Sequence, residues 1–273
     1  MPTPAPDPSP ARLAELAPAV ERIARDAGLA VAEVYAQADL GVEVKRDESP
    51  LTEADRRSEA VIQRGLAALD TGYLVVSEES RQAPYAERAR HATVWMVDPL
   101  DGTKEFVKRN GEFCVCIALV VRGEAVLGVV HAPVTQRSYV AWRGGGAHVS
   151  DAAGEALQPL PARARIDLAA RGLRFCVSRS HLSAATEAFL ADFDAPEAVP
   201  MGSALKFCGV ADGRIDVYPR HAPTMEWDTA AAQVVLEEAG GRVVEHGTDR
   251  PLRYNKPDLV NPHFVAYAPL AAH

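Results

Sequence analysis

The chain has 273 residues, of which 48% are hydrophobic, so it can bury a large core as a single domain or as two closely associated lobes. Its formal net charge of -8 argues against a broad basic surface for a nucleic acid polymer, so a phosphorylated ligand would need a local positive charge such as a bound metal ion. We find neither an apolar run that could cross a bilayer nor a signal peptide pattern. We therefore expect a cytoplasmic protein without a transmembrane segment, and peripheral association with the inner membrane face stays open.

The first third of the chain alternates helix and strand patterns. The expected elements, in chain order, are a disordered leader over 1–10, an amphipathic helix over 11–35, a short strand over 42–44, a helix from Thr52 to about Leu69, and a strand over 73–76. Thr52 is a candidate N-cap, and Asp55 would complete a capping box, which explains Asp55 without catalysis. Glu78 and Glu79 follow in a polar loop, where a solvated acidic pair is the simplest interpretation.

The centre of the chain is an apolar run over 94–97 without alternation, which predicts a strand buried on both faces. We expect this strand to end at Pro99, because proline has no N–H for the sheet ladder, and we expect a sharp turn at Gly102. Asp98 and Asp101 would then lie at the carboxyl end of a buried strand. Open α/β sheets place their ligands there.

Two interpretations of these acids stay open. In the simpler one, the carboxylates hydrogen-bond their own backbone in a strand-exit turn. In the other, Asp98 and Asp101, crowded beside the hydroxyl of Thr103, are joined by a divalent cation, and Mg²⁺ is the cation that such hard oxygen ligands suit.

A competing enzyme class also has Asp, Asp, Gly and Thr at a strand end, namely the phosphatases of haloacid dehalogenase type. Their signature has one residue between the acids, whereas this chain has two, Pro99 and Leu100. The spacing therefore favours metal-activated water over a phosphorylated aspartate.

The rest of the chain changes from hairpins to alternating helices and strands. Paired strands are expected over 113–121 with 125–131 and over 138–142 with 147–149. An Ala-, Pro- and Arg-rich stretch then suggests a lobe boundary near residue 155. Beyond it we expect a strand over 173–177, helices over 183–192 and 203–211, a strand over 215–218, a helix over 228–239, and strands over 242–245 and 264–267. The first lobe should thus be rich in antiparallel strands, and the second should be a mixed sheet covered by helices.

Cysteine and histidine give no metal signal. The cysteines are expected to be reduced core residues because none has CxxC spacing: Cys114, Cys116, Cys176 and Cys208. The eight histidines lack HxxxH and HxxE spacing, so we assign them no metal.

Several motifs together resemble one family. The string DPLDGTKEF from Asp98, the WD pair ending at Asp228, the GSALKF segment from Gly202 and the YPR segment from Tyr218 resemble the inositol monophosphatase superfamily, and KEF, GSALKF and YPR resemble its 3'(2'),5'-bisphosphate nucleotidase (CysQ-type) branch. The likeness extends from about Leu13 to Tyr267. It implies a layered αβαβα sandwich of the sugar-phosphatase type, built as one phosphatase domain from lobes of about 11–155 and 156–273.

The resemblance also implies roles for individual residues. Two or three Mg²⁺ ions would be held by Glu78, Asp98, Asp101, Asp228 and the carbonyl of Leu100. Asp55 and Thr103 would orient and deprotonate the attacking water, while Glu79 would support the ligands. Each of the other residues also has a simpler explanation. Asp228 could favour the positive end of a helix, and Ser203 could cap a helix. Lys206 could be a solvated surface residue.

The implied substrate is a small phosphorylated nucleotide, 3'-phosphoadenosine 5'-phosphate or its sulfated precursor, losing its 3'-phosphate. The substrate-binding residues implied are Glu78, Leu100, Asp101, Gly102, Thr103, Ser203, Lys206 and Asp228. Lithium sensitivity and a role in sulfur assimilation are further implications, and a homodimer stays open. The alternatives are inositol monophosphatase or fructose-1,6-bisphosphatase activity at the same site, or a non-catalytic phospholigand-binding protein.

Overall fold

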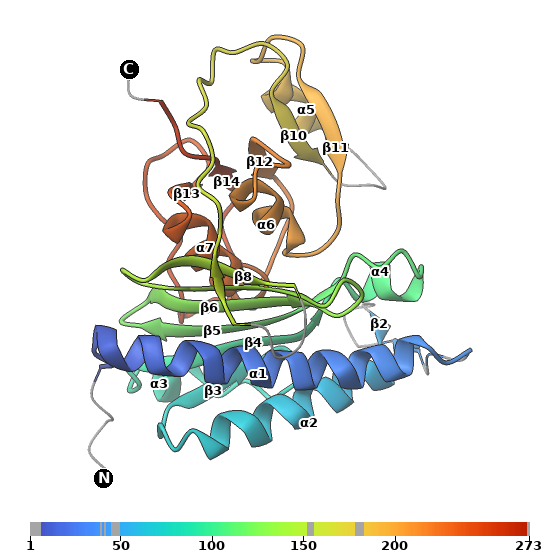
Figure 1. The fold of residues 1–273 in the computed structure, drawn as a ribbon, viewed down its shortest axis with the longest axis vertical. Helices are drawn as coiled ribbons and strands as arrows, with labels where there is room; N and C mark the ends of the chain where they lie inside the picture. Colours follow the sequence, from blue (N-terminus) through green and yellow to red (C-terminus); the bar gives the residue numbers. More distant parts are fainter. Residues whose placement is uncertain are drawn as a thin grey trace.

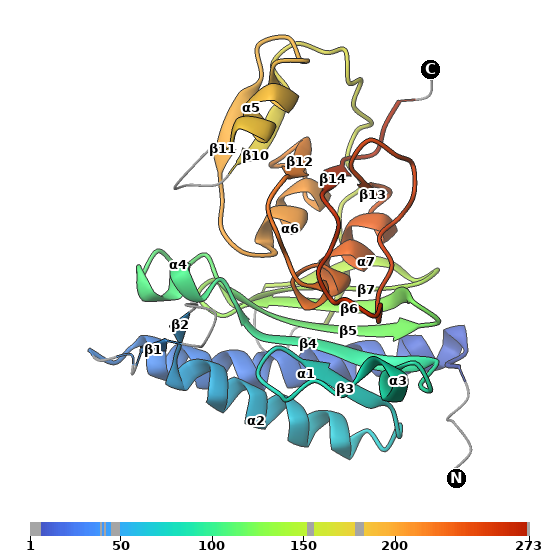
Figure 2. The same ribbon diagram turned by 180° about the vertical axis from the view of Figure 1, so that it is seen from behind.

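The computed structural model describes residues 7–38, 40, 42–44, 50–151, 156–177 and 183–271. Within these residues, two β-sheets and three groups of helices stack as five layers in the order helix, sheet, helix, sheet, helix (Figures 1 and 2). This confirms the expected αβαβα sandwich. No helix in the described part of the chain is long and apolar enough to cross a membrane.

Helices α1 (Pro10–Tyr35) and α2 (Glu53–Ala68) form the first layer and cover one face of the larger sheet (Figure 1). Helix α1 is capped by the hydroxyl of Ser9 and continues through Pro18, with its apolar stripe buried against the sheet. Helix α2 begins at the expected capping box, because the backbone N–H and the hydroxyl of Thr52 both donate to Asp55 Oδ2 at 2.7 Å.

The larger sheet is almost wholly antiparallel. Its strands, in spatial order, are β3 (Leu74–Ser77), β4 (Thr93–Asp101), β5 (Cys114–Val121), β6 (Glu124–Ala132), β7 (Arg137–Trp142), β8 (Gly146–Ser150) and β9 (Gln158–Pro159). Within this sheet, only the described pair β3 and β4 is parallel. The expected antiparallel-rich first half is therefore present. A separate short pair, β1 (Glu43–Val44) and β2 (Pro50–Leu51), lies before α2.

The smaller sheet is mixed and is separated from the larger one by helices α6 (Leu205–Ala211) and α7 (Ala230–Glu238). Its strands, in spatial order, are β11 (Glu197–Pro200), β10 (Arg174–Val177), β12 (Val217–Arg220), β14 (Phe264–Tyr267) and β13 (Arg242–Glu245). Strand β10 is parallel to β11 and β12, whereas β14 is antiparallel to β12 and β13. Helix α5 (Ala184–Leu190) covers the outer face.

The central strand corrects one expectation. We expected the strand to end at Pro99, but β4 continues through Pro99 to Asp101. Asp98 pairs with Cys116 and Asp101 with Cys114, so three steps along β4 face two along β5, which is a β-bulge. A bulge tolerates the missing N–H of proline, because the extra residue leaves the ladder there.

Two expected helix starts in the second half are also wrong. The helix expected to open at Ser203 begins at Leu205 with Ala204 as its N-cap, because Ser203 has a positive φ of 52°. The helix expected from Asp228 begins at Ala230, and Asp228 instead ends a 3-10 turn, η1 (Glu226–Asp228).

The sequence patterns did not predict five short elements, namely β2, α3 (Tyr85–Arg88), α4 (Thr103–Val107), β9 and β11. The expected leader over 1–10 lies partly outside the described residues, and its last residue, Pro10, already belongs to α1. The expected lobe boundary near 155 falls outside the described residues as well.

Candidate active site

The bulge in β4 determines where its two acids lie. Asp98 Oδ1 accepts the N–H of Leu100 at 2.9 Å. Ser58 of α2 donates its hydroxyl to the Pro99 carbonyl at 2.6 Å, and Thr103 at the start of α4 donates to the Leu100 carbonyl at 3.3 Å. Because helices on both sides hold the bulge, the strand end is a rigid mount for side chains.

The two halves of the chain meet at Gly102. Its φ is 93°, and an added Cβ would lie 3.0 Å from both the carbonyl oxygen of Glu112 and Cβ of Ser203, so only glycine fits there. Next to it, the N–H of Ala204 donates to the carboxylate of Asp101. Asp101 is thus bonded across the seam between the halves.

Three acids from distant parts of the chain form one group. Glu78 follows β3, Asp98 lies in the β4 bulge and Asp228 ends η1, and one carboxylate oxygen of each lies within 4.8 Å of the others. Asp228 is oriented by the N–H of Met225, which donates to Oδ2 at 2.9 Å.

Asp101 forms a second group with two thiols of β5. Its carboxylate and the sulfur atoms of Cys114 and Cys116 lie within 4.8 Å of one another, and Cys114 Sγ is 3.7 Å from Asp101 Oδ2. All four cysteines of the sequence are free and buried, which confirms that they are reduced core residues in this structure.

Burial and mutual repulsion shift the acids toward their protonated forms. Burial, followed by the charges of Glu78, Asp101 and Asp228, raises the pKa of Asp98 well above its ordinary value. Burial, opposed by Lys206, raises the pKa of Asp101 to about 6. Burial and the charge of Asp101 raise the pKa of Asp228 to about 8.

These acids have the chemistry of a divalent cation site. Within the described residues, no salt bridge includes Asp98, Asp101 or Asp228, although burial makes isolated carboxylates costly. Oxygen donors in such a group match the preference of hard cations, so the residues present fit a bound metal.

Asp55 and Thr103, which the family resemblance makes the candidates to orient and deprotonate the attacking water, lie next to the same bulge. Asp55 is buried at the start of α2, three residues before Ser58, which bonds the bulge directly. Thr103 is half-buried at the start of α4. Glu79, which directly follows Glu78 in the chain, is half-buried.

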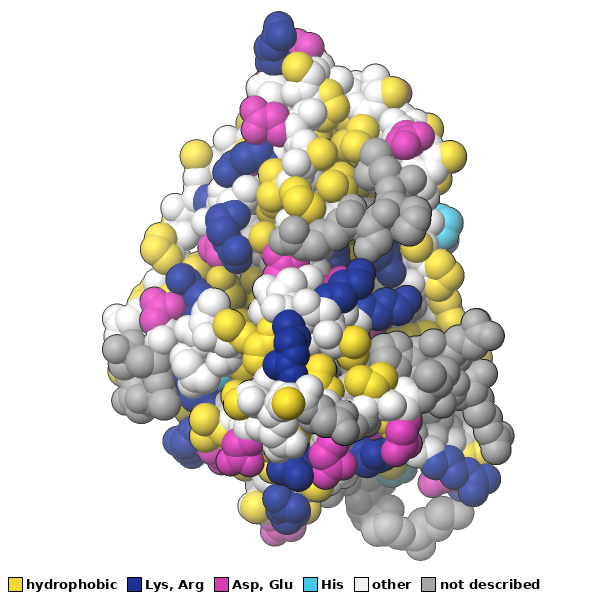
Figure 3. Space-filling view, turned by 90° about the vertical axis from the view of Figure 1, so that its right-hand side faces the viewer, with side chains coloured by type: hydrophobic (Ala, Val, Ile, Leu, Met, Phe, Trp, Pro, Cys, Tyr) yellow, Lys and Arg dark blue, Asp and Glu magenta, His cyan; other side chains and the backbone are white. Residues whose placement is uncertain are grey.

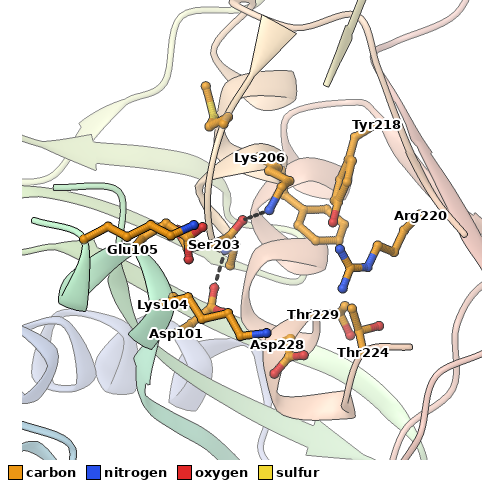
Figure 4. Close-up of a pocket in the computed structure, with 15 residues that line it drawn as sticks. Asp101, Lys104, Glu105, Ser203, Lys206, Tyr218, Arg220, Thr224, Asp228 and Thr229 are labelled. Carbon is orange, nitrogen blue, oxygen red and sulfur yellow. Dashed lines mark hydrogen bonds between the residues drawn. The ribbon is translucent and has the colours of Figure 1, made fainter. Parts of the chain in front are cut away.

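A cavity of about 370 Å³ opens between Asp101 and Asp228 on one side and basic residues of the second half on the other (Figure 4). Buried Lys206 donates from Nζ to the Ser203 carbonyl at 3.2 Å. The same Nζ lies 5.6 Å from the centroid of the Tyr218 ring, a cation–π contact.

The structure adds basic and aromatic residues to those expected from the sequence. Tyr218, Arg220, Lys104 and Lys108 all line the cavity. Seen from the side on which α4 lies, Lys and Arg side chains gather across the middle of the face (Figure 3). The YPR motif at the end of β12 was the available signal for Tyr218 and Arg220. Lys104 and Lys108 had no distinguishing signal beyond their place after the acidic motif.

Known proteins match almost the whole chain. The pattern of the inositol monophosphatase family matches residues 12–271. The 3'(2'),5'-bisphosphate nucleotidase CysQ of Escherichia coli (strain K12) is 39% identical over 245 residues, which are 89% of this chain and 96% of that protein.

Solved structures of the same family have a similar fold. CysQ from Bacteroides thetaiotaomicron, described as a bacterial member of the inositol monophosphatase family, has a TM-score of 0.82 and 40% identity, covering 93% of this chain and 97% of that one. Inositol monophosphatase from Anabaena (Nostoc) sp. PCC 7120 has a TM-score of 0.71 at 22% identity, covering 95% and 92%, which supports the fold alone.

Proposed function

Because the chain belongs to the inositol monophosphatase family, we propose that it is a phosphatase that removes the 3'-phosphate of 3'-phosphoadenosine 5'-phosphate. The observation that carries this proposal is the cavity with Asp101 and Asp228 at one side and Lys206 and Arg220 at the other. A substrate with two phosphates fits such a cavity, because one phosphate reaches the acids and the other reaches the basic side chains.

We propose that two or three Mg²⁺ ions are held by Glu78, Asp98, Asp101, Asp228 and the carbonyl of Leu100. The grouping of the carboxylate oxygens of Glu78, Asp98 and Asp228 supports this assignment. When bound, the ions neutralise charge on the phosphate and make water a stronger nucleophile at neutral pH.

The chain's own residues position the attack. Thr52 donates twice to Asp55 Oδ2, so the carboxylate has a fixed orientation from which it accepts a proton of the attacking water. The Thr103 hydroxyl, 3.3 Å from the Leu100 carbonyl, keeps the water in line with phosphorus. The first turn of α4 and Gly102 would contact the phosphate through their N–H groups.

Lys206 and Arg220 are proposed to bind the phosphate that is not hydrolysed. Lys206 is fixed by Ser203 and Tyr218, and Arg220 is held by the carbonyls of Ala222 at 3.2 Å and Pro223 at 3.0 Å. Such preorganised cations bind a phosphate oxygen without losing much conformational entropy. The sulfated precursor would present a similar anion to them and is proposed as a second substrate.

A panel assay tests the substrate. With Mg²⁺ present, kcat/KM is compared for 3'-phosphoadenosine 5'-phosphate, inositol 1-phosphate and fructose 1,6-bisphosphate. The proposal expects the nucleotide to be preferred by at least about tenfold, which corresponds to one charge-assisted contact. Equal or better turnover of the inositol ester would overturn the nucleotidase assignment, and no turnover of any member would favour a non-catalytic phospholigand-binding protein.

The Asp101→Asn variant tests the metal site. Phosphate release should collapse while the circular dichroism spectrum stays native, because the amide still accepts the N–H of Ala204 but binds cations poorly. Near-normal turnover would remove Asp101 from the catalytic site. The free, buried cysteines fit a reducing compartment, so we also propose a cytoplasmic location.

A further inference from the structure

Three histidines that are far apart in the sequence converge at one end of the smaller sheet. His221 directly follows β12, His246 directly follows β13 and His263 directly precedes β14. The strand residues next to them are register partners, since Phe264 pairs with both Arg220 and Glu245. Sheet pairing therefore brings the three imidazoles together although no sequence spacing predicts it.

Two of the three ring pairs lie close to the separation expected of ligands that share one ion, although the ring nitrogens of the three residues do not all lie within 4.8 Å of one another in this structure. The ring centroids of His221 and His246 are 4.5 Å apart, and those of His221 and His263 are 5.9 Å apart. Two imidazoles on a tetrahedral ion, with metal–nitrogen distances of about 2.0–2.1 Å, have centroids about 5 Å apart. His246 and His263 are exposed, so their rings can turn to aim a nitrogen at the ion.

The central member, His221, is buried and hydrogen-bonded through one ring nitrogen. It is only 9% exposed, and its Nδ1 lies 3.3 Å from the hydroxyl of Thr186 on α5, which in turn lies 2.9 Å from the hydroxyl of Ser183. Its other ring nitrogen, Nε2, is buried without a hydrogen-bond partner among the described residues. Metal-binding histidines are commonly fixed in this way, with one nitrogen hydrogen-bonded and the other presented to the ion.

The surroundings favour the neutral imidazole that binds metals. Burial, followed by the charges of His246 and His263, lowers the pKa of His221. Phe189 packs against two of the rings, with centroids 5.6 Å from His221 and 5.8 Å from His246, and forms an apolar wall on one side.

We propose that His221, His246 and His263 bind one divalent transition-metal ion of the Zn²⁺ or Ni²⁺ class, with water as the remaining ligand. Imidazole nitrogen suits these ions, whereas the carboxylates of the active site suit Mg²⁺. The two sites are therefore chemically distinct. Thr186 acts as a positioning residue, because it contacts His221 and not the ion.

Isothermal titration of Zn²⁺ into the metal-free full-length protein, in excess Mg²⁺ to occupy the acidic site, tests the proposal. One Zn²⁺ per chain is expected, and titration with Ni²⁺ should give the same stoichiometry. The double variant His246→Asn/His263→Asn should weaken Zn²⁺ binding by at least about 100-fold, since two of three ligands are lost. Both residues are exposed, so the variant should keep its native circular dichroism spectrum and its phosphatase activity with Mg²⁺.

Two further variants separate a metal site from general zinc binding. His91→Asn, which changes a histidine elsewhere on the chain, should leave Zn²⁺ affinity unchanged. Thr186→Val should weaken Zn²⁺ binding by about tenfold, in line with the loss of a hydrogen bond that orients a ligand. If wild type binds no Zn²⁺ in excess Mg²⁺, or if the double variant binds it as tightly as wild type does, the proposal is wrong. The phosphatase panel assay is an independent measurement and can succeed or fail separately.

Discussion

At the residue scale, Asp98 is a buried acid that has three other carboxylates as electrostatic neighbours. Without cations, its raised pKa means that the folded state must protonate it or tolerate the repulsion, whereas the unfolded chain ionises it freely. Stability is then lost as pH rises from the ordinary pKa of an aspartate toward the raised value. In a chelator at pH 7.5, Asp98→Asn should therefore raise the free energy of unfolding by about 1–3 kcal/mol, as chemical denaturation can measure.

The same substitution should abolish phosphate release when Mg²⁺ is restored. Stability and activity would thus change in opposite directions, which a general folding defect would not produce. A variant that is less stable than wild type in chelator would contradict the repulsion described here.

His131 should make the protein less stable as the pH falls, whereas Asp98 makes it less stable as the pH rises. The ring is fully buried, with Nδ1 2.9 Å from the Ser138 hydroxyl, and burial, followed by the charge of Arg25, lowers its pKa to about 3. The unfolded chain takes up this proton near pH 6.5, so stability is complete above that pH and falls as the pH drops toward 3.

The expected loss below pH 6.5 is about 1.4 kcal/mol per pH unit for this single proton. Denaturant unfolding curves between pH 6.5 and 5 would measure it, and His131→Asn should reduce the slope by that amount while lowering stability at neutral pH. An unchanged slope in the variant would show that His131 is protonated in the folded protein.

Lys206 should act on one phosphate and not on the other. Lys206→Met keeps the apolar stem that packs near Tyr218 but removes the charge. KM for 3'-phosphoadenosine 5'-phosphate should rise by about 10–100-fold, while turnover of adenosine 3'-monophosphate, which lacks the second phosphate, should change little. Equal losses for both substrates would place Lys206 at the scissile phosphate or make it structural.

At the scale of elements, helix α7 approaches the larger sheet at Gly128 of β6. An added Cβ there would lie 2.1 Å from the carbonyl oxygen of Ala231, which is backbone and cannot turn away. Gly128→Ala should therefore destabilise the protein by at least about 2 kcal/mol. Gly209→Ala in α6 is the matched control, because its added Cβ meets only side-chain atoms and none closer than 3.1 Å, and thermal unfolding should show a change of less than about 1 kcal/mol.

Most of the long elements were predictable from the sequence because their patterns are local. Strands β13 and β14 have the predicted bounds, and α2 begins at the predicted cap. The bulge at Pro99 was not predictable, since it depends on the register in which β4 pairs with β5. The start of α6 was misplaced for a similar reason, because the positive φ of Ser203 follows from the close approach to Gly102.

The candidate site was predictable only in part. The motif residues Asp98 and Asp101 are close in sequence, whereas the grouping of Glu78 with Asp228 is a result of folding. The histidine cluster at the end of the smaller sheet left no signal in the sequence at all, because its members lie on three different strand ends.

At the scale of the whole molecule, the two halves share one interior. Helix α7 belongs to the second half, yet it packs against β5, β6 and β7 of the larger sheet. We propose that the halves are lobes of one cooperative unit, since either half alone would expose an apolar sheet face.

A fragment of residues 1–155 should therefore fail to fold by itself. Its circular dichroism and amide NMR spectra should show a collapsed or aggregated chain, and co-expression with residues 156–273 should restore native spectra and activity. A fragment with dispersed amide resonances and a cooperative unfolding transition would show that the first lobe is an independent domain.

The distribution of the four acids also affects the order of events during biosynthesis. Three of them are made early, and the fourth, Asp228, emerges from the ribosome only when most of the chain has been translated. A nascent chain that ends before Asp228 therefore lacks one of the four proposed metal ligands, so we expect no hydrolysis before the polypeptide is nearly finished. Premature termination anywhere upstream of residue 228 should release products that are inert toward nucleotides.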